Sequence, residues 1–300
     1  MKLSIFGSSK IITHHIDAAK KNCFKIFSIC SLNKKSKNIK VLSKKYKIKE
    51  IFYDLKSFIK NSKENNCSIL ISGRIKDNGK VLDQCFKNNL KVLIEKPVFT
   101  EIEKYNKFFK FKKNILIGYN RIYYSNILQL KKIILTEKPF NIFIKCPEEN
   151  KEDILTNSCH IVSILYFLFG KLKIIQKIKS KNFILCLLKT KTNIPIHINF
   201  SFNSPDNFSI ELNFKNVRIE LKPIEKLCIY DGLKKIKYGN TNTFIPRIKK
   251  LINEYEISNL KPGFNLQYQN FKKFLINQRY YGIKIDQAQE IMSICKKITK

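Results

Sequence analysis

The stretch CSILISGRIKDNGKVLDQCFKNNLKVLIEKP, residues 67–97, places a short apolar run on either side of an amphipathic segment of helical length. Parallel neighbouring strands need a long connection, whereas antiparallel neighbours can be joined by a tight turn. A strand, a helix and a second strand in this order therefore predict a right-handed crossover within a parallel sheet.

The same alternation continues outward from this unit. Upstream, the apolar runs KLSIF, FKIFSIC and EIFYD are separated by helical segments, and downstream NILIGYN has the character of one more strand. Repeated strand–helix units of this kind are typical of a doubly wound α/β domain. We predict a Rossmann-like domain with a doubly wound parallel sheet over residues 1–118.

The pattern changes from Tyr119 onward. Residues 182–223 contain successive alternating runs joined by short turn segments, including Ser204-Pro205-Asp206-Asn207. Adjacent strands with short links indicate antiparallel pairing. At 300 residues and 44% hydrophobic content the chain can bury two cores. Residues 119–300 are therefore predicted to form an α+β domain with a largely antiparallel open sheet.

The formal net charge of +35 raises the question of a nucleic-acid partner. Only five of the 58 basic residues are arginines, whose fork geometry suits phosphate and base contacts best. The lysines are spread along the chain, which favours a drift of codon usage toward A and T. We therefore expect no nucleic-acid partner.

Cysteine usage and hydropathy bear on the compartment. The nine cysteines form no C-x-x-C pair and no Cys/His cluster at metal spacing, so we expect reduced core thiols and no metal. No signal peptide is recognisable, and the longest apolar run is about half of the roughly 20 residues that span a bilayer. These features predict a cytoplasmic protein without a membrane partner.

The turn after the first strand, IFGSSKII, is a candidate pyrophosphate site. Gly7 occupies the first position of the G-x-G-x-x-G pattern, Ser9 the second and Ile12 the third. An ordinary strand-to-helix turn remains an equal alternative on this signal alone. The residues that would line the site are Gly7, Ser8, Ser9, Lys10 and Ile11.

The end of the second strand bears on the choice between NAD and NADP. NAD-binding chains usually carry an acidic residue there for the ribose hydroxyls. This chain has Ser31, Asn33 and Lys34, which remove repulsion against a 2′-phosphate and add a cation. NADP is slightly favoured, although Lys34 can equally reflect the general lysine excess.

Several motifs together resemble the Gfo/Idh/MocA family of glucose-fructose oxidoreductase and inositol dehydrogenase. They are GSSKIITHHIDA, NNLKVLIEKPV, IGYNRIYY, SCHIVSILYFLFG and KPGFNLQYQNFKKFL. The resemblance implies an NAD(P)-dependent oxidoreductase that moves a hydride between the nicotinamide and a sugar, nucleotide sugar or cyclitol. It also implies a homo-oligomer, a dimer or tetramer formed through the open sheet.

The resemblance assigns roles to individual residues. Lys96 matches the family's catalytic lysine and His160 its catalytic histidine. Glu95 is expected to anchor the turn and to contribute, with Lys96, to the cofactor site. The expected substrate-binding residues are Tyr119, Asn120, Thr156, Asn157 and His160.

General chemistry supports two of these roles. Oxidising an alcohol by hydride transfer requires removal of the hydroxyl proton, which a histidine can accept near neutral pH. A lysine can donate to a developing alkoxide.

One departure weakens the catalytic interpretation. The family commonly has an aspartate four residues before its histidine, where this chain has Thr156. A family member that has lost catalysis and acts as a binding or scaffold protein is therefore the alternative.

Overall fold

The computed structural model describes residues 1–257 and 259–300, which form two compact units. The first unit comprises Met1–Tyr123 and Gly263–Ser293, and the second comprises Tyr124–Pro262 and Ile294–Lys300. The sequence-based division at residue 118 assumed one cut in the chain. In the structure the chain returns to the first unit after Pro262, because helix α9 (Phe264–Leu275) packs against α1 (Ile12–Lys21). Each unit is described by itself below.

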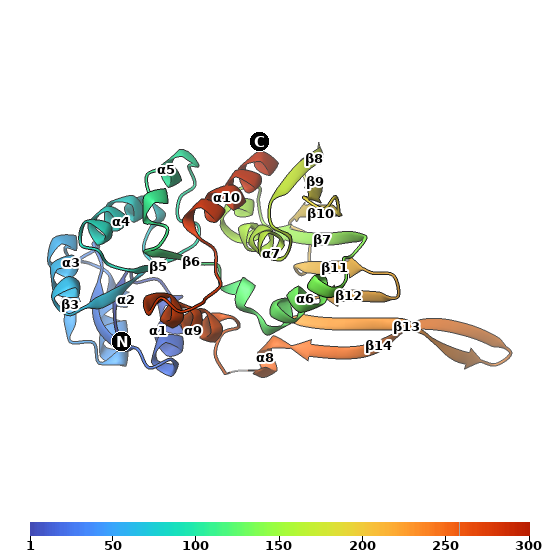
Figure 1. Cartoon of the computed structure of the whole chain (residues 1–300), viewed down its shortest axis with the longest axis horizontal. Helices are drawn as coiled ribbons and strands as arrows, with labels where there is room; N and C mark the ends of the chain where they lie inside the picture. Colours follow the sequence, from blue (N-terminus) through green and yellow to red (C-terminus); the bar gives the residue numbers. More distant parts are fainter. Residues whose placement is uncertain (258) are drawn as a thin grey trace. The chain divides into compact units, whose positions relative to one another are not determined.

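The first unit is built on a six-stranded sheet in the order β3-β2-β1-β4-β5-β6 (Figure 1). All five strand pairs are parallel, and the order is that of a Rossmann sheet. The strands are β1 (Lys2–Phe6), β2 (Lys25–Cys30), β3 (Glu50–Phe52), β4 (Cys67–Ile71), β5 (Val92–Glu95) and β6 (Ile115–Gly118). Ile69 and Leu93 on the inner strands β4 and β5, and Ile117 on the edge strand β6, are fully buried, as expected for a sheet covered on both faces.

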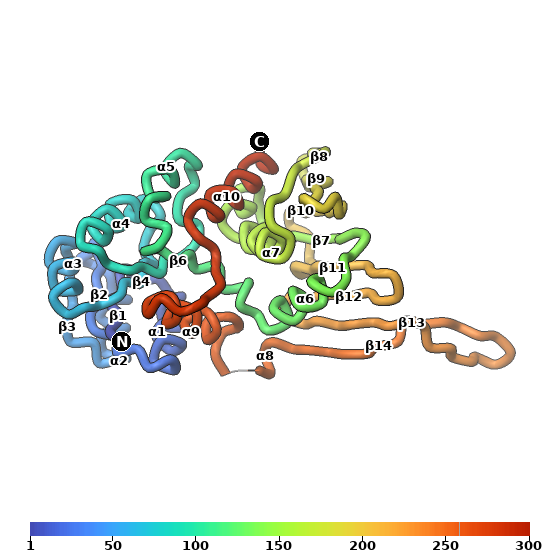
Figure 2. The backbone as a smooth tube through the Cα atoms, viewed as in Figure 1, coloured from blue at the N-terminus to red at the C-terminus, as the bar shows by residue number. Residues whose placement is uncertain are grey.

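The helices of this unit follow the predicted alternation. They are α1, α2 (Lys37–Tyr46), α3 (Leu55–Glu64), α4 (Asn78–Lys87), α5 (Glu103–Asn106), α9 and most of α10 (Ile285–Thr299), with short turns η1 (Ile75–Asp77), η2 (Phe109–Phe111) and η3 (Asn120–Tyr123). Figure 2 shows α1 and α9 side by side although they lie at opposite ends of the sequence. The Rossmann-like prediction is confirmed.

The second unit contains an eight-stranded sheet in the order β14-β13-β12-β11-β7-β10-β9-β8. Its strands are β7 (Asn141–Glu148), β8 (Leu172–Lys179), β9 (Phe183–Thr190), β10 (Pro195–Phe202), β11 (Ser209–Asn213), β12 (Val217–Leu221), β13 (Lys226–Tyr238) and β14 (Thr241–Asn253). Every pair is antiparallel except β7 and β10. Burial alternates along β7, β9 and β10, so one face packs on the core and the other is open. The prediction of a largely antiparallel open sheet is confirmed.

The helices of the second unit are α6 (Ser125–Thr136), the π-helical turn η4 (Ile154–Ser158), α7 (Cys159–Phe169) and α8 (Glu254–Ile257). Helix α7 ends at Phe169, and Gly170 follows it at φ 75°. Side chains of α7 such as Ile161 and Leu165 are fully buried. The apolar run of this helix therefore belongs to the core of the unit.

Strands β13 and β14 form a long ribbon that the sequence did not reveal. Its distal part extends past the neighbouring strand β12, as Figure 1 shows in orange. Exposed apolar side chains such as Leu233 and Phe244 interrupt its lysines, so neither strand has a clean buried face. A strand without that alternation gives no periodicity from which to predict it.

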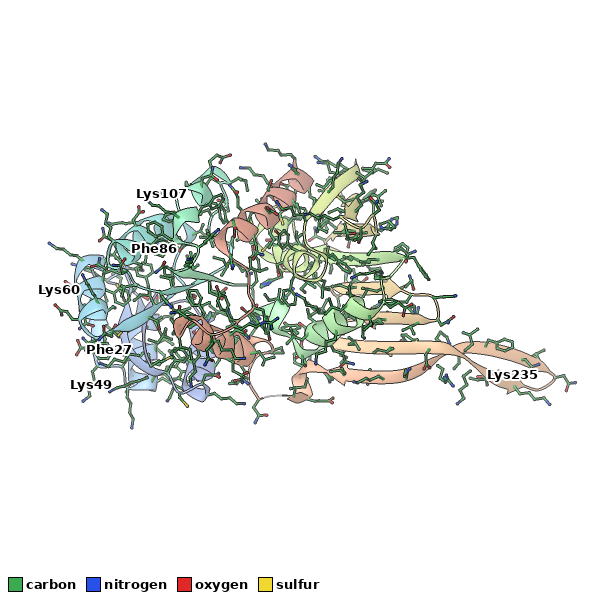
Figure 3. All side chains as sticks on the ribbon, in the orientation of Figure 1. Phe27, Lys49, Lys60, Phe86, Lys107 and Lys235 are labelled. Atoms are coloured by element: carbon green, nitrogen blue, oxygen red, sulfur yellow. The ribbon has the colours of Figure 1, made fainter. Side chains whose placement is uncertain are left out.

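The basic residues are distributed over both units. Figure 3 shows the labelled side chains of Lys60 and Lys107 in the first unit and Lys235 on the ribbon projecting from the backbone. Seven of the nine cysteines are buried, which agrees with the expected position of most of them in the core. Within residues 1–257 and 259–300, no helix combines the length and the hydropathy needed to cross a bilayer.

Candidate functional site

The turn that follows β1 has the geometry of a phosphate cradle. Gly7 lies at φ 125°, and a Cβ there would stand 2.2 Å from the backbone oxygen of Ser72. Only glycine fits this close approach of two backbones. Helix α1 then begins at Ile12, with no side-chain cap at its N-terminus and no acidic residue in its first turn. A helix start of this kind favours an anion because its first amides and its dipole point toward it.

Hydroxyl groups tie this turn to the neighbouring strands. The Ser9 hydroxyl lies 3.3 Å from the carbonyl oxygen of Ser72, to which it donates, and 3.2 Å from the Ser72 hydroxyl. The Ser8 hydroxyl lies 2.9 Å from that of Ser36, and Asn38 donates to the Ser8 carbonyl. The serine at the second glycine position therefore serves to hold the turn against the end of β4.

A groove of about 280 Å³ opens beside the turn. Its lining includes Gly7, Ser8, Ser9, Ser31, Asn33 and Arg74. Arg74 pairs with Asp77 at 2.8 Å. Lys34, Lys10 and Ile11 lie outside this lining, and Lys34 is exposed. Ser31 is buried, and its hydroxyl accepts a hydrogen bond from the backbone N–H of Asn33.

The groove fits the diphosphate of a dinucleotide in its donor set. The Cβ-free approach at Gly7, the serine hydroxyls and the uncapped start of α1 all favour an anion. The groove lining contains one carboxylate, Asp77, and Arg74 neutralises it. The residues that would hold the diphosphate are therefore Gly7, Ser8 and Ser9.

The second part of the site is the carboxyl end of β5. Glu95 is the last residue of the strand and pairs with Gly118 of β6. Lys96 and Glu95 are half-buried, and the following segment is fixed by Asn78, which donates to the Val98 carbonyl at 2.8 Å. In open parallel sheets ligands bind at the carboxyl ends of the strands, which is where Lys96 lies.

Gly118 is required by the position of Glu95. A Cβ on Gly118 would stand 2.7 Å from Glu95 Oε1 and 3.2 Å from Gln267 Nε2. Gln267 is fully buried, and neither polar atom of its amide has a hydrogen-bond partner among the described residues. The carboxylate of Glu95 therefore lies over the backbone of β6, beside a buried amide from α9.

A histidine of α1 reaches the same carboxylate. His15 is fully buried, its Nε2 lies 3.0 Å from Glu95 Oε1, and its Nδ1 lies 3.1 Å from the hydroxyl of Tyr268. Burial, and secondly the charge of Glu95, raise the pKa of Tyr268 well above its ordinary value. His15 is not among the site residues expected from the sequence. His15 and Tyr268 both lie in segments that resemble the family. Nothing in the sequence of these segments indicates that the two side chains are in contact.

The expected substrate residues fall into both units. Tyr119 and Asn120 follow β6 and belong to the first unit, where both are buried, although the sequence placed them at the start of the second domain. Thr156, Asn157 and His160 belong to the second unit.

His160 is a buried residue in the first turn of α7, 5% exposed. The turn before it, Ile154–Ser158, is π-helical, so the four-residue spacing from Thr156 to His160 crosses two helix types. Thr156 is exposed, and its hydroxyl donates to Asp153 Oδ1 at 3.5 Å. The α-helical spacing that motivated the pairing of Thr156 with His160 is therefore not the local geometry.

Glu148, at the end of β7, is a buried acid that the sequence did not single out. Its carboxylate accepts from the amide of Asn157 at 3.0 Å and from the hydroxyl of Ser158. Burial raises the pKa of Glu148 above its ordinary value, and the two hydrogen bonds oppose that rise. Glu148 thus fixes the π-helical turn immediately before the helix that carries His160.

The open face of the second unit's sheet carries a larger groove of about 620 Å³. In its lining, the rings of Phe143 on β7 and His197 on β10 stack with centroids 4.9 Å apart. Ile178 and Leu185 also line the groove and are exposed. The face is part apolar and part charged, since Lys145 and Glu220 also line it.

Comparisons with known proteins bear on these features. Residues 1–114 match the model of the family GFO_IDH_MocA, described as an oxidoreductase family with an NAD-binding Rossmann fold. A comparison with curated protein sequences gives no match.

Solved structures share the fold over nearly the whole chain. The dehydrogenase MviM from Clostridium difficile is 17% identical with a TM-score of 0.78, covering 99% of this chain and 98% of that one. UDP-N-acetylglucosamine 3-dehydrogenase GnnA from Acidithiobacillus ferrooxidans is 9% identical with a TM-score of 0.77, covering 99% and 96%. A super-repressor mutant of Gal80p from Saccharomyces cerevisiae is 14% identical with a TM-score of 0.76, covering 99% and 94%.

At these identities the likeness is one of fold. The match to the family model adds the sequence signal over the cofactor domain, where the glycine turn and the Glu95-Lys96-Pro97 segment lie. Over residues 1–114, the chain is therefore similar in sequence to the Gfo/Idh/MocA family of NAD-binding oxidoreductases.

Proposed function

We propose that the chain is an NAD(P)-dependent dehydrogenase or reductase of a sugar, nucleotide sugar or cyclitol. The observation that carries the proposal is that the first unit contains both an anion cradle at Gly7 and Lys96 at the carboxyl end of a parallel strand. The sugar class is supported by the activity of a structural neighbour, which is a UDP-N-acetylglucosamine 3-dehydrogenase.

The roles of the residues follow from the balance of the reaction. Bound NAD(P) would exchange a hydride with the substrate carbon. When an alcohol is oxidised, the C–H bond breaks with its electron pair and the hydroxyl proton must leave to a base. We assign Lys96 to the substrate oxygen and His160 to the proton. Tyr119, Asn120, Thr156 and Asn157 are the proposed substrate contacts.

NADP remains slightly favoured over NAD. The groove lining has Ser31 and Asn33 where an NAD enzyme usually presents an acid, and exposed Lys34 follows directly in the sequence. The cytoplasm, and a dimer or tetramer formed through the open sheet, stay predictions from the sequence.

Cofactor titration tests the proposal directly. NADPH or NADH at about 100 times its Kd should stabilise the folded protein by about 2.7 kcal/mol. For units of this size that corresponds to a rise in Tm of roughly 5–10 °C. Failure of both cofactors to raise the Tm would contradict the proposal.

Mutation of Lys96 then tests its role. Lys96→Ala should stay folded and lose turnover with a panel of nucleotide sugars and cyclitols. Lys60→Ala is the matched control, because the Lys60 side chain on α3 is 77% exposed and does not line the groove at Gly7. Equal turnover in the two variants would remove Lys96 from the mechanism.

A binding or scaffold protein without catalysis is the second candidate. It is favoured by Ser9 at the second glycine position and by exposed Thr156 in place of an acid. It predicts cofactor binding without turnover, so the same titration and turnover assay separate the two functions.

A further inference from the structure

The segment that follows β4 forms one wall of the groove beside the glycine turn. A Cβ on Gly7 would stand 2.2 Å from the carbonyl oxygen of Ser72 and 2.9 Å from the amide nitrogen of Gly73. Arg74 comes next in the chain, and it lines the same groove of about 280 Å³ as Gly7 and Ser9. This groove is small for a ligand pocket. A diphosphate seated on the turn would therefore lie beside the Arg74 side chain.

A short turn holds one edge of the Arg74 guanidinium group. Arg74 Nε donates to Asp77 Oδ2 at 2.8 Å, and the backbone N–H of Asp77 donates to the Arg74 carbonyl at 2.9 Å. Asp77 is the last residue of η1, and its side chain is only 19% exposed. The carboxylate therefore orients the guanidinium group through Nε before any ligand binds.

The other edge of the guanidinium group remains available. Its terminal nitrogens carry further N–H donors, and the group has no acceptor. Apart from the pair with Asp77, the Arg74 side chain makes no hydrogen bond within residues 1–257 and 259–300, and it is 61% exposed. Such a fork matches two oxygens of a phosphate group. Among the described residues that line the groove, Arg74 is the one cation.

The order of the strands indicates which phosphate Arg74 can reach. Strand β1 pairs with β2 on one side, where Phe6 is level with Cys30, and with β4 on the other, where Phe6 is level with Ile71. A bound dinucleotide places its diphosphate over the turn after β1 and its ribose 2′ position at the end of β2. Arg74 approaches from the β4 side, so the turn lies between it and Ser31. The diphosphate is therefore nearer to Arg74 than a 2′-phosphate would be.

We propose that Arg74 is a diphosphate-binding residue, whose terminal nitrogens bind the diphosphate oxygens of the cofactor while Asp77 holds Nε. The turn at Gly7 supplies backbone amides, and Arg74 supplies a cation that the turn does not bring into the groove, since Lys10 lies outside the lining. NAD and NADP carry the same diphosphate, so Arg74 binds both equally. This role rests on the proposed function only in that a dinucleotide binds, because it needs no hydride transfer.

ADP-ribose tests the role, because it carries the diphosphate but no nicotinamide. In titration calorimetry, Arg74→Ala should weaken the binding of ADP-ribose at least about ten-fold, the equivalent of one hydrogen bond to a charged group. Lys76→Ala is the matched control, because Lys76 is an exposed cation of the same η1 turn and does not line the groove. Its Kd should stay within about two-fold of wild type, since salt screens an exposed charge.

Both variants are first shown to be folded by circular dichroism. An unchanged Kd in Arg74→Ala would overturn the proposal. An equal loss of affinity in Arg74→Ala and Lys76→Ala would also overturn it, because the effect would then come from the net charge of the turn.

A second probe separates the diphosphate from the 2′-phosphate. Arg74→Ala should weaken the binding of ADP-ribose and of 2′-phospho-ADP-ribose by the same factor. A loss confined to the 2′-phosphorylated probe would assign Arg74 to the 2′-phosphate and overturn the proposal.

The same titrations distinguish a failure of this role from a failure of the proposed function. Wild-type binding of ADP-ribose that is unchanged in Arg74→Ala contradicts only the role of Arg74. Failure of the wild type to bind either probe contradicts the cofactor site, and with it both proposals. The expected loss in Arg74→Ala, found in a protein that turns over no substrate, supports the role of Arg74 and contradicts the dehydrogenase.

Discussion

Gly118→Ala should displace the carboxylate of Glu95 and destabilise the first unit. A Cβ at this position would stand 2.7 Å from Glu95 Oε1, whereas ordinary contact begins at 3.4 Å, a shortfall of 0.7 Å (3.4 minus 2.7). The carboxylate is held on its other side by His15 at 3.0 Å. A shift of that size away from the new methyl group is enough to stretch or break the bond to His15.

The expected cost comes from two sources. Overpacking a well-filled interior costs about 1–3 kcal/mol. A broken hydrogen bond to a charged group adds up to about 3 kcal/mol. We therefore expect the free energy of unfolding to fall by about 2–5 kcal/mol, measured by denaturant titration with the slope checked for constancy.

Two comparisons isolate the cause. Gly79→Ala is the matched control, because a Cβ there meets nothing closer than Phe99 at 3.7 Å and alanine favours the helix by up to about 1 kcal/mol. The same Gly118→Ala change made in a Glu95→Ala background should cost much less, since the clashing carboxylate is gone. Gly118→Ala with a wild-type midpoint would refute the reasoning, and an undiminished cost in the Glu95→Ala background would assign the clash to the Ile94 carbonyl at 3.1 Å instead.

Two further changes test the turn of the first unit and the buried acid of the second. Gly7→Ala should lower the free energy of unfolding by about 2–5 kcal/mol and abolish cofactor binding. Residue 7 has a φ of 125°, and its new Cβ would stand 2.2 Å from the backbone oxygen of Ser72. An unchanged denaturation midpoint would contradict this expectation. Burial raises the pKa of Glu148 above 4.5, so the folded state binds its proton more tightly and stability falls as pH rises from 4.5 through the folded-state pKa. Glu148→Gln should therefore gain stability relative to wild type between pH 4 and 8, and a pH-independent difference would count against a raised pKa.

The fold of the first unit could be predicted because its signals are local. Each strand of the parallel sheet is a short apolar run, and each crossover is an amphipathic helix, as in residues 67–97. The return of Gly263–Ser293 to this unit could not be predicted in the same way. An amphipathic helix such as α9 shows that it has an apolar face but does not show which surface covers that face.

In the candidate site, too, residues with a local sequence signal could be predicted and residues placed by contacts between distant elements could not. Gly7 and Lys96 could be proposed because each follows a strand directly, and the geometry of the strand end dictates what the next residue can reach. The roles of His15 and Glu148 could not, because their partners are set by packing between elements. The π-helical turn at Ile154–Ser158 also escaped prediction, since sequence spacing was interpreted with an α-helical period.

The changed glycine turn is weaker support for a lost activity than its sequence suggests. Ser9 replaces a glycine, but its hydroxyl bonds to Ser72 at the end of β4, so the side chain is already accommodated within the unit. The position that tolerates no side chain is Gly7, and it is intact. Lys96 also follows a carboxylate that is held by a buried histidine and by the absence of a Cβ on the neighbouring strand. Intact Gly7 keeps the space for a cofactor that an enzyme and a cofactor-binding scaffold both need. The altered second glycine position therefore does not by itself favour the scaffold.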